Sequence, residues 1–216
     1  MPKTDNFDTI IFMEQLDTQI IRNLKNISLS MFRKNFFGIF HGSISTKLEE
    51  GHFLINKKDA IFDDLNQDSF ITLYHKQDYR WNDASIDAFI HSLLYQNIPN
   101  AKYIAYGMPP FTIAYTLSHN QITPKDYFGY ELLGNIEVYN PKDYDTWYER
   151  ADVEINRFFK ENDKKIMVIK GYGVYVYHRD LEMLSKLIAV LENSCKILHF
   201  DAILQNHKSN EDLFDI

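Results

Sequence analysis

The chain is poor in cysteine, in long apolar runs and in positive charge. It contains 1 cysteine, Cys195, so no disulfide can form within the chain, and we expect a reducing, cytoplasmic location. No apolar run approaches the roughly 18 residues that span a bilayer, and the N-terminus lacks the basic-then-apolar order of a signal peptide. The formal net charge of -7 and the pI of about 5.6 disfavour broad binding to nucleic acid or to an anionic membrane.

The apolar content is sufficient for one substantial core. Hydrophobic residues make up 45% of the 216 residues and aromatic residues 15%, and no change in composition marks a second domain. We therefore expect a single domain over residues 1–216. Its polar end, residues 206–216, is expected to be a mobile tail.

Hydrophobic periodicity predicts helices and strands in alternation. Apolar residues at helical spacing indicate helices over 12–34, 83–97, 110–118, 144–161 and 180–204. Short apolar runs bounded by turn residues indicate strands over 38–41, 43–47, 52–56, 69–74, 103–106, 166–169 and 173–177, with two more around Gly134 within 126–139. Because strands occur in hairpins as well as between helices, the predicted fold class is α/β, a three-layer α/β/α domain with a mostly antiparallel central sheet.

The stretch FGIFHGSISTK, residues 37–47, places two of the chain's 8 glycines around His41. Two interpretations are open. Backbone amides and small hydroxyls at a glycine turn can approach a phosphate or a carboxylate closely. The same residues can form an ordinary bend between strands.

Asp87 and His91 lie four residues apart in a predicted helix and therefore share one of its faces. This spacing suits a metal site, a hydrogen-bonded pair or, for Asp87 alone, a carboxylate that stabilises the helix N-terminus. The hydrogen-bonded pair is the favoured interpretation.

Three segments, taken in order, resemble the class II aldolase and adducin family. They are HGSISTK at 41–47, where the family usually reads Gly-Asn-Ile-Ser-x-Arg, DASID at 83–87, where it reads Pro-Ser-Ser-Glu, and VIKGYG at 168–173, where it reads Leu-x-x-His-Gly. The resemblance covers roughly residues 15–205 and implies a class II aldolase-like fold. It also implies a homo-oligomer, a tetramer in many catalytic members.

The resemblance implies a ligand-binding set. The residues at the family's substrate-anion positions are Ser43, Lys47, Asn56, Lys58 and Ser85. Two departures alter the site: Ile86 replaces a serine, and Asp59 replaces a glycine in the loop after the strand 52–56. An acidic Asp59 would repel a phosphate.

The resemblance also implies that the metal site is altered. Many family enzymes hold a divalent metal, often zinc, with three histidines, and the matching residues here are Tyr106, Met108 and Tyr172. A phenol with a pKa of about 10 binds zinc poorly at neutral pH, and a thioether suits copper(I) better. We therefore expect no bound metal and no cofactor. Asp87, at the family's catalytic glutamate position, and Tyr172 are the candidate catalytic residues.

Three functions remain open. The favoured one is a divergent member without zinc-dependent aldolase activity that binds a small phosphorylated or carboxylated ligand. The alternative is an active metal-dependent lyase, cleaving a carbon–carbon bond of a sugar phosphate, with zinc held at a non-standard site by residues such as Asp87, His91 or His41. The third is metal-free proton transfer, with Asp87 as base and Lys47, Lys58 or Tyr172 stabilising an oxyanion.

Overall fold

The computed structural model describes the backbone of residues 5–39, 41–49 and 51–211, and the side chains within this part from residue 18 to residue 205. The sequence predicted a mobile tail over 206–216. Residues 206–211 belong to the last helix, α6 (Leu181–Glu211), residues 212–216 lie outside the described residues, and the mobility of this segment stays a prediction. Among the residues described, no helix is both long and apolar enough to cross a membrane.

One eight-stranded sheet forms the centre of the molecule, in the order β3-β2-β1-β4-β8-β7-β6-β5. Its strands are β1 (Ser43–Glu49), β2 (His52–Asn56), β3 (Phe70–Tyr74), β4 (Tyr103–Gly107), β5 (Gln121–Ile122), β6 (Ile136–Tyr139), β7 (Ile166–Ile169) and β8 (Gly173–His178). Every pairing is antiparallel except that of β6 with β7, which is parallel. The predicted mostly antiparallel sheet is thus confirmed.

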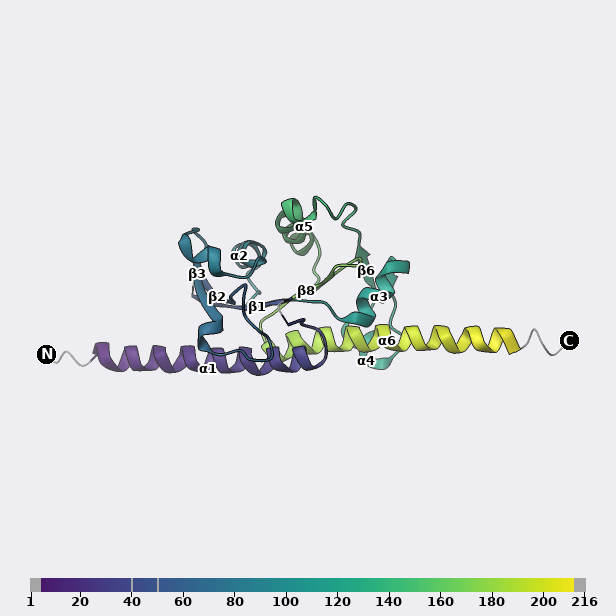
Figure 1. The fold of residues 1–216 in the computed structure, drawn as a ribbon, viewed down its shortest axis with the longest axis horizontal. Coiled ribbons are helices and arrows are strands. Elements are labelled where there is room, and N and C mark those ends of the chain that lie inside the picture. Colours follow the sequence, from purple (N-terminus) through teal and green to yellow (C-terminus); the bar gives the residue numbers. More distant parts are fainter. Residues whose placement is uncertain (1–4, 40, 50, 212–216) are drawn as a thin grey trace.

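Helices cover both faces of the sheet (Figure 1). The long helices α1 (Asp5–Arg33) and α6 lie along one face, and α2 (Ala88–Asn97) and α5 (Trp147–Glu161) lie on the other. The shorter α3 (Pro110–Ser118) and α4 (Tyr127–Leu132) pack beside α6. Two 3-10 turns, η1 (Gln67–Ser69) and η2 (Tyr79–Asp83), flank β3. The α/β/α layering predicted from the sequence is confirmed.

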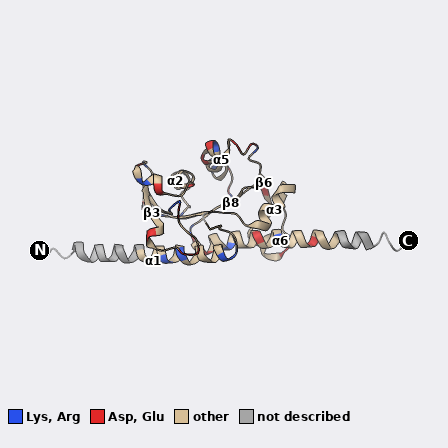
Figure 2. Cartoon of the chain, in the orientation of Figure 1, with Lys and Arg blue, Asp and Glu red and all other residues tan. Residues whose placement is uncertain are grey.

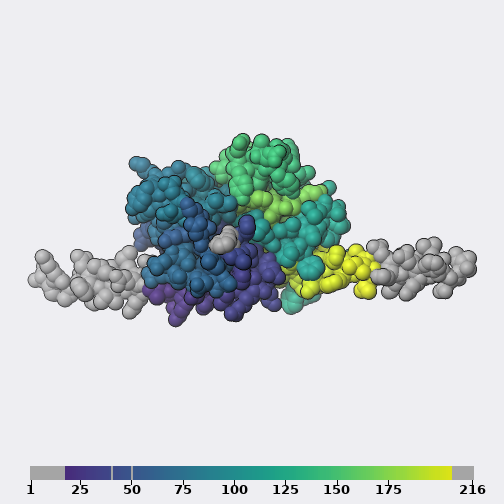
Figure 3. Space-filling model, in the orientation of Figure 1, coloured from purple at the N-terminus to yellow at the C-terminus, as the bar shows by residue number. Residues whose placement is uncertain are grey.

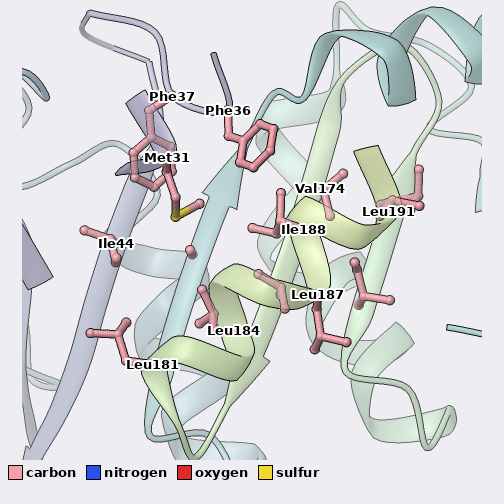
Figure 4. Close-up of a cluster of buried hydrophobic side chains, with 14 of the residues drawn as sticks. Met31, Phe36, Phe37, Ile44, Val174, Leu181, Leu184, Leu187, Ile188 and Leu191 are labelled. Atoms are coloured by element: carbon pink, nitrogen blue, oxygen red, sulfur yellow. The ribbon is translucent and has the colours of Figure 1, made fainter. Parts of the chain in front are cut away.

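Each face of the sheet has its own hydrophobic core, because successive side chains of a strand point to opposite faces. In β8, Val174 and Val176 face α1 and α6, whereas Tyr175 and Tyr177 face α2 and α5. Figure 4 shows the first core, in which Leu184, Ile188 and neighbouring side chains of α6 pack toward the sheet. The space-filling view shows residues of α6, in yellow, at the edge of the body that the strands and the other helices form (Figure 3). Lysine and arginine are interspersed with aspartate and glutamate over the molecule (Figure 2).

Two predicted strands were wrong. Residues 38, 39 and 41 are not in a strand, and Phe40 lies outside the described residues. The amide of Gly38 donates to the carbonyl of His41 at 2.8 Å, so this backbone closes a local loop instead of pairing with a strand. The first strand predicted within 126–139 is helix α4, because the carboxylate of Asp126 accepts from the amide of Gly129 and caps the helix N-terminus.

Candidate functional site

A small cavity lies on the side of the sheet that α2 and α5 cover. Its volume is about 170 Å³. The residues that line it are His41, Gly42, Asn56, Lys58, Ser85, Ile86, Asp87, Tyr106 and Tyr148. They come from the loop before β1, the end of β2, the approach to α2, β4 and α5. The structure therefore brings together Asn56, Lys58, Ser85, Asp87 and Tyr106, all of which the sequence singled out.

Backbone hydrogen bonds hold two sides of this cavity together. The amide of Ser85 donates to the carbonyl of Asn56 at 3.0 Å, and the amide of Lys58 donates to the carbonyl of Asp83 at 3.0 Å. The amine of Lys58 also donates to the carbonyl of Asn82 at 2.8 Å. The segment after β2 is thus fixed against the segment that leads into α2, which explains why Lys58 and Ser85 meet.

The register of the three central strands forms the floor of the site. Ser43 of β1 is paired with Tyr106 of β4, and Tyr106 is paired with Tyr175 of β8. The three residues therefore form one row across the sheet. Tyr106 and Tyr175 both belong to the core on the α2 and α5 side.

Asp87 is the buried carboxyl of the site. It is 2% exposed, and it lies directly before α2 without making a side-chain cap to that helix. The hydroxyl of Tyr175 donates to Asp87 Oδ1 at 2.9 Å. Burial raises the pKa of Asp87, and this effect exceeds the lowering by hydrogen bonds from Ser43 and Tyr175. The proton of this carboxyl is therefore held more tightly than that of an exposed aspartate.

The side chains of Asp87 and His91 are linked through Ser43, and the direct hydrogen bond between the two residues is the helical bond from the amide of His91 to the carbonyl of Asp87 at 3.0 Å. The hydrogen-bonded side-chain pair that the sequence favoured is therefore not a direct contact. His91 is fully buried, and its Nε2 lies 2.9 Å from Ser43 Oγ while its Nδ1 lies 2.6 Å from Ser45 Oγ. Burial lowers the pKa of His91 to about 3, so the ring is neutral near pH 7. Ser45 Oγ is in turn hydrogen-bonded to the hydroxyl of Tyr95, with 2.6 Å between the two oxygens.

Sequence analysis had assigned no site role to Ser45, Tyr95 or Tyr175. A signal for the first two was present. The Ser-x-Ser pattern of β1 places Ser43 and Ser45 on the same face, and Tyr95 follows His91 by four residues on α2. Tyr175 could not be found in this way, because it reaches Asp87 from a strand 88 residues further along the chain.

Lys47 does not join the cavity, although the sequence predicted that it would converge with Ser43. Both residues lie on β1, but four residues along a strand separate them by about 13 Å. The charge of Lys47 instead acts on Lys102 and His75, where it lowers the pKa of both side chains, in each case after the larger effect of burial. Lys47 is therefore near the opposite end of β1.

Aromatic rings fill the space beside Asp87. The ring of Tyr106 lies 5.1 Å from that of Tyr172 and 4.7 Å from that of Tyr175, centroid to centroid. The hydroxyl of Tyr106 donates to the backbone carbonyl of Tyr172 at 3.0 Å, and the hydroxyl of Tyr172 donates to that of Tyr148 at 3.1 Å. Burial raises the pKa of both Tyr106 and Tyr172, so both phenols are neutral near pH 7.

Comparison with known proteins identifies the family. The model of the Class II Aldolase and Adducin N-terminal domain matches residues 22–199. The chain belongs to this family. No match was found among curated protein sequences.

Solved structures share the class II aldolase fold. An l-fuculose-1-phosphate aldolase from Thermus thermophilus is 19% identical, with a TM-score of 0.77 over 86% of this chain and 95% of its own. YgbL from Escherichia coli, a putative aldolase/epimerase/decarboxylase, is 16% identical, with a TM-score of 0.70 over 86% and 90%. A sugar-phosphate aldolase from Thermotoga maritima is 14% identical, with a TM-score of 0.66 over 86% and 96%.

The donors at the expected class II aldolase metal positions do not fit zinc. The sequence resemblance assigns these positions to Tyr106, Met108 and Tyr172, which offer two neutral phenols and a thioether. Zinc in proteins takes thiolate, imidazole or carboxylate ligands. Within the part of the chain that the structure describes, no group of three or more His, Cys, Asp or Glu side chains is placed to hold a metal ion.

Asp59 lies in a neighbouring hollow and not in the lining of the cavity. That hollow, of about 460 Å³, is lined by Lys57, Asp59, Ala60, Ile61, Asp64, Asn66, Asp68, Ser69 and Asp83. Asp59 would therefore not contact an anion bound in the cavity beside Lys58, and the expected direct repulsion does not arise there.

Proposed function

We propose that this member of the class II aldolase and adducin family binds a small phosphorylated or carboxylated ligand in the cavity beside Asp87, without zinc-dependent aldolase activity. The observation that carries the proposal is the ring contact between Tyr106 and Tyr172. These tyrosines contact each other, and the hydroxyl of Tyr106 donates to the carbonyl of Tyr172. This contact supports the proposal, because two of the three residues that the resemblance assigns to metal positions are phenols hydrogen-bonded within the protein.

The lining of the cavity supports an anionic ligand. Lys58, Asn56 and Ser85 all line it. The amine of Lys58 donates one hydrogen to the carbonyl of Asn82 and has two more, and the hydroxyl of Ser85 accepts from the amide of Asp87 and keeps its own hydrogen. The side-chain amide of Asn56 is used within the protein, by a backbone amide and a backbone carbonyl. An amine and neutral hydrogen-bond donors are the groups that hold a phosphate or a carboxylate. The volume of about 170 Å³ is below the roughly 300–1,000 Å³ of drug-sized ligand pockets, which favours a small ligand.

A second function, metal-free proton transfer, is favoured by the placement of Asp87. This carboxyl lines the cavity, and burial raises its pKa from the usual acidic range toward neutral pH. A pKa near the working pH suits a group that takes up and returns a proton. Asp87 would move the proton, while Lys58 would stabilise the negative charge that develops on the ligand. This function uses the same bound anion and adds a chemical step to it.

The alternative of a metal-dependent lyase has less support. Sugar-phosphate aldolases are among the proteins of similar structure, but His91 is not available as a zinc ligand while Ser43 and Ser45 occupy both its ring nitrogens. Asp87 and His41 would remain, which is fewer than the three protein ligands of a catalytic zinc site.

We further propose a cytosolic location and a homotetramer, the assembly that the family resemblance implies. The location rests on Cys195, the single cysteine. Its thiol is fully buried, and burial raises its pKa to about 12, so it is poorly suited to redox chemistry.

Two measurements test the proposed function. Elemental analysis of the purified protein should find no stoichiometric zinc, whereas zinc together with a lyase activity that a chelator removes would overturn the proposal. Titration with inorganic phosphate and with sugar phosphates, followed by NMR, should show binding at the cavity. Lys58→Met should weaken it by about tenfold, because a charge-assisted contact is lost.

Lys57→Met is the matched control. Lys57 precedes Lys58 but lines the neighbouring acidic hollow. Its removal subtracts the same charge from the protein and should leave phosphate affinity within about twofold, since salt screens the long-range effect of one half-buried charge outside the cavity. Equal weakening in both variants would show that the anion is held by overall charge and not by this cavity.

A further inference from the structure

A buried chain of hydrogen-bonding groups runs from the cavity into the interior. It passes from Asp87 to Ser43, from Ser43 to His91, from His91 to Ser45, and from Ser45 to Tyr95. Each of these residues is at most 2% exposed. Asp87, His91 and Tyr95 lie at four-residue spacing along one face of α2, from its N-cap to its last turn, and the two serines occupy the facing side of β1.

Proton counting gives this chain a direction. The hydroxyl of Tyr95 lies 2.6 Å from Ser45 Oγ and 3.5 Å from its other acceptor, the carbonyl of Lys102, so it donates to Ser45. Ser45 then donates to Nδ1 of His91, and because a neutral imidazole has one N–H, the hydrogen is on Nε2 and is donated to Ser43 Oγ. The single hydrogen of Ser43 is left for its other partner, Asp87.

The reverse direction is less well satisfied. It requires a protonated Asp87 that donates to Ser43, and it leaves the hydroxyl of Tyr95 to donate to the carbonyl of Lys102, which is 3.5 Å away. A hydrogen bond of that length is weak. In the forward direction the ring N–H and the hydroxyls of Ser45 and Tyr95 each have an acceptor within 2.9 Å.

We infer that His91 is a positioning residue of this site, a neutral ring with its hydrogen on Nε2 that makes Ser43 donate to Asp87. The inference rests on the proposed proton-transfer role of Asp87 and deepens it. With Ser43 on one side and Tyr175 on the other, both hydroxyl protons point at the carboxylate. The oxygen lone pairs of Asp87 that do not accept from these two hydroxyls are then available to a ligand in the cavity, which Asp87 lines.

Other groups near Asp87 come from every element around it. They are Tyr106 on β4, Tyr172 in the turn before β8, Tyr148 on α5, Lys58 after β2 and His41 before β1. The four tyrosines, counting Tyr175, are neutral near pH 7 because burial raises the pKa of each. Lys58 contributes a positive charge to the lining of the cavity.

NMR of the protein labelled with ¹⁵N in histidine tests this inference, because a protonated and an unprotonated ring nitrogen have different shifts. At pH 7 the wild-type His91 should carry its hydrogen on Nε2. Ser43→Ala should move the hydrogen to Nδ1, which can still donate to Ser45, because a buried N–H is rarely left without an acceptor. Ser45→Ala is the matched control, because it removes the hydroxyl that faces Nδ1 instead of the one that faces Nε2, and it should leave the hydrogen on Nε2.

Three results would overturn the inference: a hydrogen on Nδ1 in the wild type, a charged ring at pH 7, or the same tautomer in both alanine variants. The wild-type spectrum decides by itself if either variant does not fold. Phosphate binding is measured separately. If Lys58→Met leaves it unchanged while the tautomers behave as expected, the ligand proposal fails and the role of His91 stands.

Discussion

At the scale of single residues, burial shifts the two central titratable groups in opposite directions. It lowers the pKa of His91 to about 3 from 6.5 and raises the pKa of Asp87 above 3.8. Both shifts favour the uncharged form of the side chain, because low-dielectric surroundings disfavour charge. The polar groups of the site are thereby kept inside the protein through hydrogen bonds between Ser43, Ser45 and the ring instead of through a salt bridge.

These shifts predict how stability depends on pH. Between about pH 6.5 and pH 3, His91 is protonated in the unfolded chain but not in the folded chain. The free energy of unfolding therefore falls by about 1.4 kcal/mol for each unit by which the pH is lowered in this range. Asp87 acts in the opposite sense, because above pH 3.8 the folded chain holds its proton more tightly than the unfolded chain. Asp87→Asn removes this compensation, so wild type should gain stability relative to the variant as the pH falls from 7 to 4.5.

Chemical denaturation at each pH, fitted for the free energy of unfolding, measures that difference. Asp59→Asn is the control, since Asp59 is an exposed carboxylate outside the cavity. Parallel stability curves for wild type and Asp87→Asn across this range would contradict the raised pKa of Asp87.

Gly42, in the loop before β1, has to be a glycine for two reasons, its backbone conformation and its lack of space for a side chain. Its φ is +133°, and a Cβ placed there would lie 2.6 Å from Cδ1 of Phe37. We expect Gly42→Ala to destabilise the protein by about 1–3 kcal/mol more than Gly51→Ala, because overpacking of a buried ring adds to the backbone strain. Gly51 also has a positive φ, +91°, but no neighbouring atom within 4 Å. Thermal unfolding of the two variants measures the difference, and equal losses would refute it.

At the scale of elements, α6 supplies the N-terminal cap that α3 lacks. Pro109 precedes α3 and offers no side-chain cap. Instead Glu192 of α6 accepts from the amides of Phe111 and Thr112 at 2.9 and 2.8 Å and from the hydroxyl of Thr112 at 2.9 Å. A carboxylate is favoured at this end of a helix by the helix dipole. The cap holds α3 against α6, directly after the β4 residues of the site.

Glu192→Gln should therefore destabilise the protein by about 2–4 kcal/mol, because the amide loses the charge and places an N–H group against backbone donors. Urea denaturation measures the loss. Glu137→Gln on β6, an exposed carboxylate, is the control and should change stability by less than about 0.5 kcal/mol. A loss of that small size for Glu192→Gln as well would show that the cap contributes little.

At the scale of the whole molecule, the sheet brings together three segments that are far apart in the sequence. The strand order β1-β4-β8 makes Ser43, Tyr106 and Tyr175 neighbours in one row. The connection that leads into β8 also places Tyr172 against Tyr106. The site therefore depends on the complete central sheet and not on any single motif.

This arrangement predicts that a zinc site can be restored. Tyr106→His, Met108→His and Tyr172→His together should raise zinc uptake toward one ion per chain, since three imidazoles would then lie around one space. Elemental analysis and zinc titration measure the uptake, with the Tyr106→His single variant as control. Uptake no higher in the triple variant than in the single variant would mean that the three positions do not converge as the family resemblance implies.

Much of the fold could be predicted from the sequence, because it depends on local periodicity. The alternation in 173–177 and the helical spacing in 180–204 gave elements close to β8 and α6. Prediction was wrong where a local hydrogen bond outweighed the propensity of aromatic residues for strands, as at Asp126 before α4. The two-residue strand β5 is too short to carry a periodic signal.

The sequence by itself determined which residue types the site contains: the hydroxyls of β1, the carboxyl before α2, and the tyrosines and methionine at the positions that the family resemblance assigns to metal ligands. Only the tertiary structure decided how they are used. Spacing placed Asp87 and His91 on one helix face, but the serine that joins them comes from another element. Lys47 was excluded from the cavity by its position along the same strand. Contacts between distant segments, and the burial that shifts the pKa of each group, exist only once the sheet has formed.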